Sequence, residues 1–311
     1  MTAAKVFIVI LLFLASAGCT PKEQTHRPAR KLTVVCTLFP LYDMARSIGG
    51  EYADVSLLLP PGVEAHNFEP RPGDILRLND ADIFIYTGHF MEPWAESLIK
   101  GLDTGRLLII NASSGISLMK QGNGWRQSGG HVHAEGMDPH IWLDFDYARA
   151  MVETILSGFI ARDPAHGVTY RHNAATYAAR LEELDHKFRV GLANCGSRAI
   201  IHGGHFAFGY LAKRYRLQYV SAFPPSGESE PNARQMAEMV GLIRKTGTGT
   251  LFIEELTSPR LADTLARETG SRLMMLHAAH NVSRDDLNRG VTFPALMERN
   301  LESLRQGLQC R

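Results

Sequence analysis

The sequence has almost no net charge. Its 311 residues carry 33 Lys and Arg against 32 Asp and Glu, and Lys5 is the only one of these in residues 1–18. The remaining chain therefore balances 32 basic against 32 acidic side chains. Binding to nucleic acid requires a basic excess or a basic stripe to neutralise phosphates. We therefore expect no nucleic-acid partner.

Long apolar runs are also absent. A membrane-spanning helix takes about 20 apolar residues, and the longest run, over 6–15, is too short. Lys5 precedes this run and small residues follow it, which is typical of a signal peptide rather than of a retained anchor. We predict a signal peptide over 1–18 and a polar tether over 19–31.

Two cleavage sites fit the end of the predicted signal peptide. Ser16-Ala17-Gly18-Cys19 resembles a bacterial lipobox, with Ser16 where Leu is usual, and it predicts a lipid on Cys19. Ala15-Ser16-Ala17 fits an ordinary cleavage site instead. On the first interpretation the protein is tethered in the periplasm or at the cell surface by the lipid on Cys19.

Cysteine is scarce, with four in the chain. Cys36 ends an apolar, strand-like run and is expected to be a buried thiol. Cys195 follows a long helical pattern and Cys310 lies beside the C-terminus, where a disulfide would hold the chain end. Because an exported protein can keep a disulfide, we expect Cys195 and Cys310 to be paired. Two unpaired structural thiols are the alternative.

Short apolar runs alternate with helical patterns, which predicts an α/β fold with mostly parallel sheets flanked by helices. The expected strands fall into two sets, over 33–36, 55–59, 83–86 and 107–110, and over 199–202, 219–222, 250–254 and 272–276. In each set the second strand leads into a Pro-Pro turn, a Glu-Pro pair and a helix, starting near Pro72 and near Asn232. This repeat predicts two similar lobes, over 32–165 and 195–311.

A long helix is predicted between the lobes, over 166–194. Tyr177, Leu181, Leu184 and Phe188 recur at helical spacing among charged residues. At about 1.5 Å per residue such a helix is roughly 40 Å long, so it could run along both lobes. Because a helix is stiffer than a loop, we expect little hinge motion.

Four histidines lie in loops or at strand ends, where open α/β sheets bind their ligands. His66 lies between an expected strand and a helix, His140 follows Asp138-Pro139, His205 follows a strand, and His277 ends one. Each alone is compatible with a surface or core histidine, but two such positions in each lobe indicate a metal site.

These segments carry a resemblance to a known family. The chain from Thr33 to Cys310 resembles the substrate-binding proteins of bacterial zinc and manganese ABC transporters, the cluster A-I or zinc-uptake (ZnuA-like) family. The matching segments are His66-Asn67-Phe68-Glu69-Pro70, Asp138-Pro139-His140-Ile141-Trp142-Leu143-Asp144 and His205-Phe206-Ala207-Phe208-Gly209-Tyr210. The resemblance implies two α/β lobes, a rigid linking helix and a metal site in the cleft between the lobes. We expect the protein to be a monomer.

The resemblance also implies the ligands and the partner. His66, His140 and His205 match metal-ligand positions, and His277 falls where the family commonly has Asp, with His280 as the alternative fourth ligand. Glu254 matches a cleft Glu, and Glu69, Asp138 or Glu254 could hold imidazole N–H groups. A site of imidazoles favours Zn²⁺ over Mn²⁺, which prefers oxygen ligands. The implied function is to bind Zn²⁺ outside the cytoplasm and deliver it to an ABC permease.

Alternatives to this function remain. A manganese- or iron-binding member of the same family is the nearest, and a surface adhesin that retains the metal fold is another. A zinc hydrolase is disfavoured because the sequence lacks H-E-x-x-H and a fourth histidine would close the open metal position. We therefore expect no enzyme activity. His131 and His133 lie in a glycine-rich stretch that could collect metal ions or be a plain polar loop.

Overall fold

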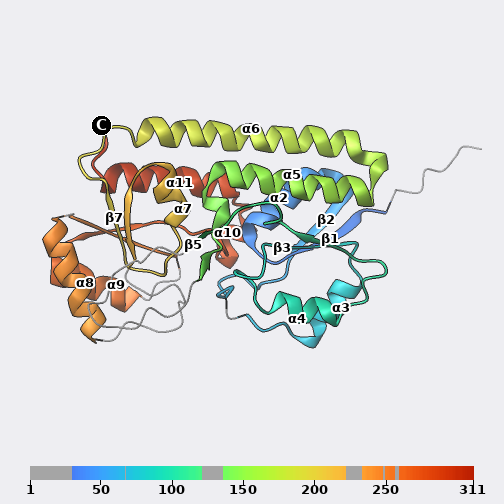
Figure 1. Ribbon diagram of the computed structural model, residues 1–311, viewed down its shortest axis with the longest axis horizontal. Coiled ribbons are helices and arrows are strands. Elements are labelled where there is room, and N and C mark those ends of the chain that lie inside the picture. Colours follow the sequence, from blue (N-terminus) through green and yellow to red (C-terminus); the bar gives the residue numbers. More distant parts are fainter. Residues whose placement is uncertain (1–29, 67, 121–135, 222–232, 248, 256–258) are drawn as a thin grey trace, which may run out of the picture. The chain divides into compact units, whose positions relative to one another are not determined.

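The computed structural model describes residues 30–66, 68–120, 136–221, 233–247, 249–255 and 259–311 (Figure 1). Lys31–Arg311 forms one compact unit. The predicted signal peptide, the Cys19 lipid site and the stretch with His131 and His133 lie outside the described residues. Within the described ranges, no helix combines the length and the apolar character that a membrane crossing needs.

Two parallel four-stranded sheets form the framework. The first has the order β2-β1-β3-β4 and consists of β1 (Leu32–Cys36), β2 (Ala53–Leu57), β3 (Ile83–Tyr86) and β4 (Leu108–Asn111). The second has the order β8-β7-β9-β10 and consists of β7 (Ala199–His202), β8 (Gln218–Ser221), β9 (Thr250–Ile253) and β10 (Arg272–Met275). The two orders are equivalent, so the predicted α/β fold with two similar lobes is confirmed.

Helices flank both sheets. The first lobe contains α2 (Phe39–Gly49), α3 (Pro72–Asn79), α4 (Ala95–Lys100), α5 (Phe145–Arg162) and the short turns η1 (Gly50–Tyr52), η2 (Ile141–Leu143) and η3 (Pro164–His166). The second contains α7 (Gly209–Arg214), α8 (Ala233–Thr246), α9 (Pro259–Thr269), α10 (Arg284–Asn288) and α11 (Phe293–Gly307). A small antiparallel pair, β5 (Met119–Lys120) and β6 (Met137–Asp138), was not predicted.

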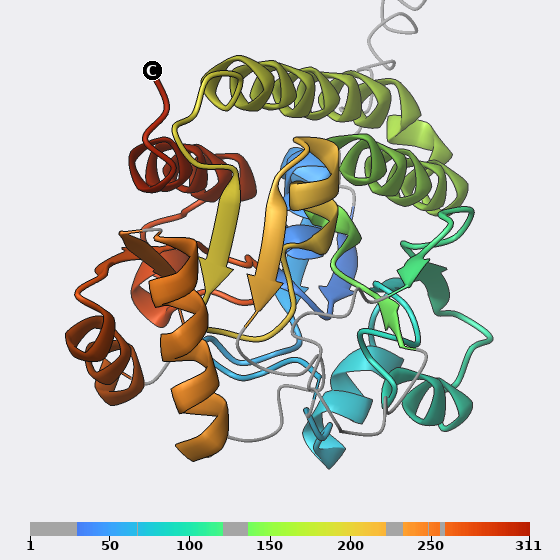
Figure 2. The same ribbon diagram turned by 60° about the vertical axis from the view of Figure 1, so that its left-hand side comes forward.

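The long helix α6 (Gly167–Gly191) joins the lobes and packs against α2 and α5 of the first and α11 of the second (Figures 1 and 2). Its buried residues recur every three or four positions: Tyr170, Ala174, Tyr177, Leu181, Leu184 and Phe188. This spacing places them on one face of the helix. The prediction of one long helix joining the lobes is thus confirmed, while the domain boundaries drawn around it stay a prediction.

The buried carboxylate of Asp43 links the three helices α2, α6 and α11. Asp43 of α2 accepts a hydrogen bond from the Tyr177 hydroxyl of α6 at 2.9 Å and from the Phe293 backbone N–H of α11 at 3.0 Å, both at Oδ2. Its Oδ1 pairs with Arg46 at 3.1 Å. Since α2 belongs to the first lobe and α11 to the second, Asp43 links the lobes directly.

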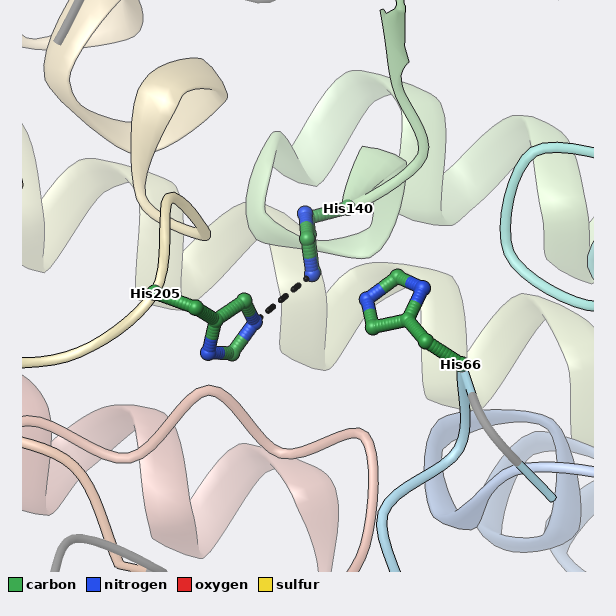
Figure 3. A group of neighbouring side chains, drawn as sticks. All are labelled: His66, His140 and His205. Carbon is green, nitrogen blue, oxygen red and sulfur yellow. Dashed lines mark hydrogen bonds between the residues drawn. The ribbon is translucent and has the colours of Figure 1, made fainter. Parts of the chain in front are cut away.

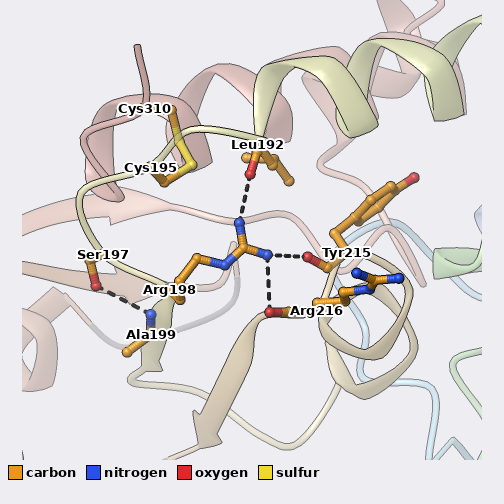
Figure 4. Close-up of a disulfide and its surroundings, with 8 residues drawn as sticks. All are labelled: Leu192, Cys195, Ser197, Arg198, Ala199, Tyr215, Arg216 and Cys310. Atoms are coloured by element: carbon orange, nitrogen blue, oxygen red, sulfur yellow. Dashed lines mark hydrogen bonds between the residues drawn. A yellow bond between two sulfur atoms is a disulfide. The ribbon is translucent and has the colours of Figure 1, made fainter.

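A disulfide joins Cys195 and Cys310, as predicted (Figure 4). Backbone bonds flank it, from Gly196 N to Gln309 O at 3.1 Å and from Ser197 N to Leu308 O at 3.0 Å. Arg198 donates to the carbonyl of Leu192 at 2.7 Å, just beyond α6, and to those of two residues that follow α7, Tyr215 and Arg216. Cys36 is a buried free thiol, also as predicted, and burial raises its pKa.

Candidate metal centre

Three histidines from separate loops converge where the two lobes meet. His66 lies in the loop between β2 and α3, His140 lies between β6 and η2, and His205 follows β7. Each can offer one ring nitrogen such that these atoms all lie within 4.8 Å of one another. Figure 3 shows the rings of His140 and His205 meeting while that of His66 lies beside them. The first lobe supplies two of these side chains and the second lobe one.

His140 is held by its neighbour Asp138. Its ring Nδ1 lies 2.8 Å from Asp138 Oδ1, which also accepts the His140 backbone N–H at 3.0 Å. The ring is 1% exposed. Burial, followed by the charges of His205, His66 and His280, lowers the pKa of His140 well below its usual value. The ring is therefore neutral at pH 7, as a metal ligand must be.

His205 is held by Glu254, which follows β9. Its Nδ1 lies 2.6 Å from Glu254 Oε2, and its backbone N–H donates to Oε1 at 2.9 Å. Burial lowers the pKa of His205, but the charge and hydrogen bond of Glu254 outweigh it and raise the pKa above its usual value. Gly204 makes room for this contact, since a Cβ there would lie 2.2 Å from Glu254 Oε1.

Among the described residues, no carboxylate forms a hydrogen bond or ion pair with the His66 ring. Its Nε2 is buried without a hydrogen-bond partner in the described part of the chain. Its ring centroid lies 5.6 Å from that of His140 and 5.9 Å from that of His205. Burial, and then the charge of His205, lowers the pKa of His66 to about 4. A buried nitrogen without a partner is costly unless something binds it.

The arrangement fits a small tetrahedral cation. Because Asp138 and Glu254 face the Nδ1 atoms, the Nε2 atoms of His140 and His205 turn toward each other, 3.2 Å apart. Two ligands at about 2.0–2.1 Å from a tetrahedral Zn²⁺ are roughly 3.3 Å apart. The pair thus has the separation that zinc coordination requires, with the unpartnered Nε2 of His66 nearby.

The structure does not bring His277 into this group. Its Nδ1 lies 3.1 Å from Glu255 Oε1 and 2.9 Å from the Ala279 backbone nitrogen, so this atom is already engaged. His280 instead packs its ring edge-to-face against His205, with centroids 5.5 Å apart. The Nδ1 of His280 is buried without a hydrogen bond within the described ranges, and its Nε2 interacts with Glu64 Oε2 at 3.5 Å.

Of the three carboxylates predicted to hold imidazole N–H groups, the structure places two beside the histidine rings. Asp138 and Glu254 contact the rings, whereas Glu69 is exposed and no hydrogen bond in the described residues joins it to any of the three rings. Sequence reasoning missed Glu64, whose Oε1 accepts the backbone N–H groups of Ala65 and His66 at 2.9 and 3.3 Å. Its place two residues before His66, in the same loop, was the available signal.

The chain is similar to known zinc-uptake proteins. The family model described as "Zinc-uptake complex component A periplasmic" matches residues 34–307. The high-affinity zinc uptake system protein ZnuA of Bacillus subtilis is 33% identical over 309 residues, covering 97% of each chain. The zinc-binding lipoprotein AdcA of Streptococcus pneumoniae is 30% identical over 311 residues, which are 98% of this chain and 61% of AdcA.

Solved structures share the fold. The Zn(II)-bound ZnuA-like domain of Streptococcus pneumoniae AdcA is 31% identical with a TM-score of 0.76, and the match covers 89% of this chain and 99% of the domain. The laminin-binding protein Lmb of Streptococcus agalactiae, described as bifunctional with adhesin and metal transporting activity, is 27% identical with a TM-score of 0.77. That match covers 90% of this chain and all (100%) of Lmb.

Proposed function

The chain belongs to the family of periplasmic zinc-uptake complex component A proteins, and on that premise we propose that it captures Zn²⁺ outside the cytoplasmic membrane and delivers the ion to an ABC-type uptake permease. The observation that carries the proposal is the facing pair of Nε2 atoms on His140 and His205, 3.2 Å apart, beside the unpartnered Nε2 of His66. The family is one of transport binding proteins rather than enzymes.

We propose His66, His140 and His205 as three ligands and His280, in preference to His277, as the fourth. The unpartnered Nδ1 of His280 and the packing of its ring against His205 support this choice. Asp138 and Glu254 act on the ligands, because a carboxylate on Nδ1 fixes the tautomer and leaves Nε2 free to bind. Glu254 also raises the pKa of the His205 ring that it holds.

This donor set favours zinc over the alternatives of manganese and iron. Imidazole suits Zn²⁺, whereas Mn²⁺ prefers oxygen ligands and six-fold coordination. The relatives named for zinc, and the Zn(II)-bound AdcA domain, support the same choice. Cu²⁺ binds imidazole more strongly than Zn²⁺ does, so selectivity against copper depends on geometry and supply.

Delivery requires an anchored or periplasmic position. The relatives described as periplasmic or as lipoproteins support an extracytoplasmic location, and we propose that a lipid on Cys19 tethers the chain there. From that position the loaded protein docks on its permease as a monomer. Zinc uptake by a deletion strain in zinc-limited medium tests this role. Undiminished uptake would favour the adhesin activity named for Lmb.

The decisive experiment is native mass spectrometry of the untagged chain without its predicted signal peptide. After removal of metal by chelator, equimolar Zn²⁺, Mn²⁺, Fe²⁺, Cu²⁺ and Ni²⁺ are offered at pH 7.5. We expect one tightly bound Zn²⁺. Preferential Mn²⁺, or no tightly bound ion, would contradict the zinc assignment.

Single alanine variants test the ligand assignment, and the pair His280→Ala and His277→Ala compares the two candidates for the fourth position. We expect His66→Ala, His140→Ala, His205→Ala and His280→Ala each to weaken Zn²⁺ binding by at least about a hundredfold, because each removes a direct ligand. His277→Ala should change the dissociation constant far less. A large loss with His277→Ala and none with His280→Ala would return the fourth position to His277.

A further inference from the structure

A segment of the second lobe, residues 276–282, crosses onto the first lobe directly after β10. We call it the crossing segment. Its carbonyls accept hydrogen bonds from first-lobe donors, namely Phe39 N to His280 O at 3.2 Å, Gly62 N to Val282 O at 3.1 Å and Trp142 Nε1 to Ala278 O at 2.8 Å. The crossing segment is therefore fastened along its length to the lobe that carries His66 and His140.

The side chain of Asn281 in this segment hydrogen-bonds to the first lobe. It is 1% exposed. Its Nδ2 donates to Pro60 O at 2.9 Å and to Val63 O at 2.7 Å, while its Oδ1 accepts the Val282 backbone N–H at 2.8 Å. Both amide hydrogens and the oxygen are thus used. A single buried amide from one lobe holds a turn of the other.

That turn leads directly to His66. Val63 N donates back to Pro60 O at 3.1 Å, so the two carbonyls that Asn281 binds belong to one tight turn, three residues before the histidine. On the other side of the loop, Trp94 Nε1 donates to Ala65 O at 3.1 Å. The loop is therefore held from both lobes, by Trp94 from its own lobe and, from the other, by the Asn281 side chain together with the Val282 carbonyl.

The position of the His66 ring depends on these loop contacts more than the positions of the His140 and His205 rings do. Asp138 and Glu254 orient the rings of His140 and His205 directly, whereas the ring nitrogen Nε2 of His66 has no partner within the described residues. The place of the His66 ring is consequently set by the backbone of its loop. A metal site needs its ligands held to within about 0.5 Å.

We propose that Asn281 is a positioning residue for the metal centre: by binding Pro60 O and Val63 O it sets where His66 stands relative to His205. This inference rests on the proposed zinc site. It makes zinc affinity depend on contact between the lobes, because one lobe supplies His66 and the other supplies the amide that places it. Loss of an outer group that orients a ligand typically costs ten- to a hundredfold in metal affinity.

The test is the Zn²⁺ dissociation constant of Asn281→Ala, measured by chelator competition on the full mature chain. We expect a ten- to hundredfold increase. The matched control is Asn300→Ala, because Asn300 is also 1% exposed and also makes two backbone bonds, to His277 N at 2.7 Å and His277 O at 2.8 Å, but inside the second lobe. Both variants should lower the melting temperature, and only Asn281→Ala should raise the dissociation constant more than about threefold.

A double-mutant cycle separates positioning of His66 from an effect on the adjacent His280. In a His66→Ala background Asn281→Ala should have no further effect on affinity, whereas in a His280→Ala background its effect should persist. The absorption spectrum of the Co²⁺-loaded protein should also change with Asn281→Ala, since it reports ligand geometry. If Asn281→Ala does not fold, Asn281→Ser replaces it, because the smaller polar side chain keeps the site hydrated and removes the same two bonds.

Several outcomes would overturn the proposal. They are an unchanged dissociation constant in Asn281→Ala, an equal effect of Asn300→Ala, and an effect that persists without His66 but disappears without His280. Each leaves the zinc site itself intact. A wild-type chain that binds no Zn²⁺ would overturn the proposed function together with the positioning role, so the two failures are distinguishable.

Discussion

In the metal-free protein, the pKa values of the four histidines are shifted in two directions. Burial lowers the pKa of His66 to about 4 and that of His140 well below its usual value, so both rings are neutral at pH 7. His205 has a raised pKa beside Glu254. For His280, burial is outweighed by the hydrogen bond and charge of Glu64 and by the charges of Glu255 and Glu254, which raise its pKa to about 9. The rings of His66 and His140 are thus ready to bind at pH 7, whereas His280 must first release a proton.

Zinc affinity should therefore keep rising with pH well above the range of an ordinary histidine. Below about pH 9 His280 is protonated, and a ligand that must lose one proton weakens binding by about tenfold for each pH unit below its pKa. We expect at least that slope between pH 7 and pH 9, measured by chelator competition. His280→Ala should bind more weakly and reduce the slope by about one decade per pH unit. Equal affinity at pH 7, 8 and 9 in the wild type would contradict His280 as a ligand.

At the residue scale, sequence predicted positions better than it predicted contacts. His66 and His205 could be found because each follows a strand of a parallel sheet, and His140 because the segment Asp138-Pro139-His140 matches the family. The choice between His277 and His280 could not be made, since it depends on a turn at Ala279, whose φ of 65° is left-handed. A non-glycine residue rarely adopts this conformation. No local sequence pattern therefore predicted that the His277 and His280 rings would contact different neighbours.

At the scale of elements, each of the eight sheet strands lies within two residues of its predicted range. The central strands β1, β3, β7 and β9 are mostly buried and apolar, so their composition identifies them. The β5–β6 pair is different, because each strand has two residues and no periodicity. A contact from α7 fixes its position: the Tyr210 hydroxyl accepts a hydrogen bond from Met119 N–H at 2.8 Å and donates one to Asp138 O at 2.9 Å.

The disulfide should stabilise the fold without tuning the metal site. It closes a loop with a sequence separation of 115 residues, for which loop-closure entropy predicts up to about 5 kcal/mol. We expect Cys195→Ser with Cys310→Ser to lower the free energy of unfolding by about 2–5 kcal/mol in denaturant titrations. Because Cys195 precedes β7 and His205 follows it, the two features lie at opposite ends of that strand.

The matched measurement is the zinc dissociation constant of the same double variant, which should stay within about threefold of the wild type. A tenfold loss of affinity at a temperature where the variant is fully folded would show that the chain end near Cys310 also supports the metal loops. An unchanged free energy of unfolding would mean that the backbone bonds beside the disulfide already hold that end.

For the whole molecule, the two lobes share more than a linker. One cluster of buried side chains extends through both, including Phe84 and Trp142 from the first lobe and Phe208 and Phe293 from the second. Arg214 of α7 adds polar links, pairing with Asp144 at 2.7 Å, Asp146 at 2.8 Å and Asp185 at 2.6 Å. Together with α6 and Asp43, these contacts resist any wide opening of one lobe against the other.

A shared core predicts that the lobes unfold together. Calorimetry should give one transition whose van't Hoff and calorimetric enthalpies agree, which is the test of two-state behaviour. Two resolved peaks would mean that each lobe is stable alone and that the buried cluster does not couple them. That result would also weaken the expectation of small lobe motion, since separable lobes are free to hinge.

Zinc should shift this single transition as a whole, because its ligands come from both lobes. A free concentration one hundred times the dissociation constant adds about 2.7 kcal/mol, which corresponds to a rise of roughly 5 °C in melting temperature for a chain of this size. His140→Ala provides the control, since it removes a ligand and should abolish the shift while leaving one transition. If zinc instead split the transition in two, the ion would be binding within one lobe alone, and a site assembled across both lobes would be wrong.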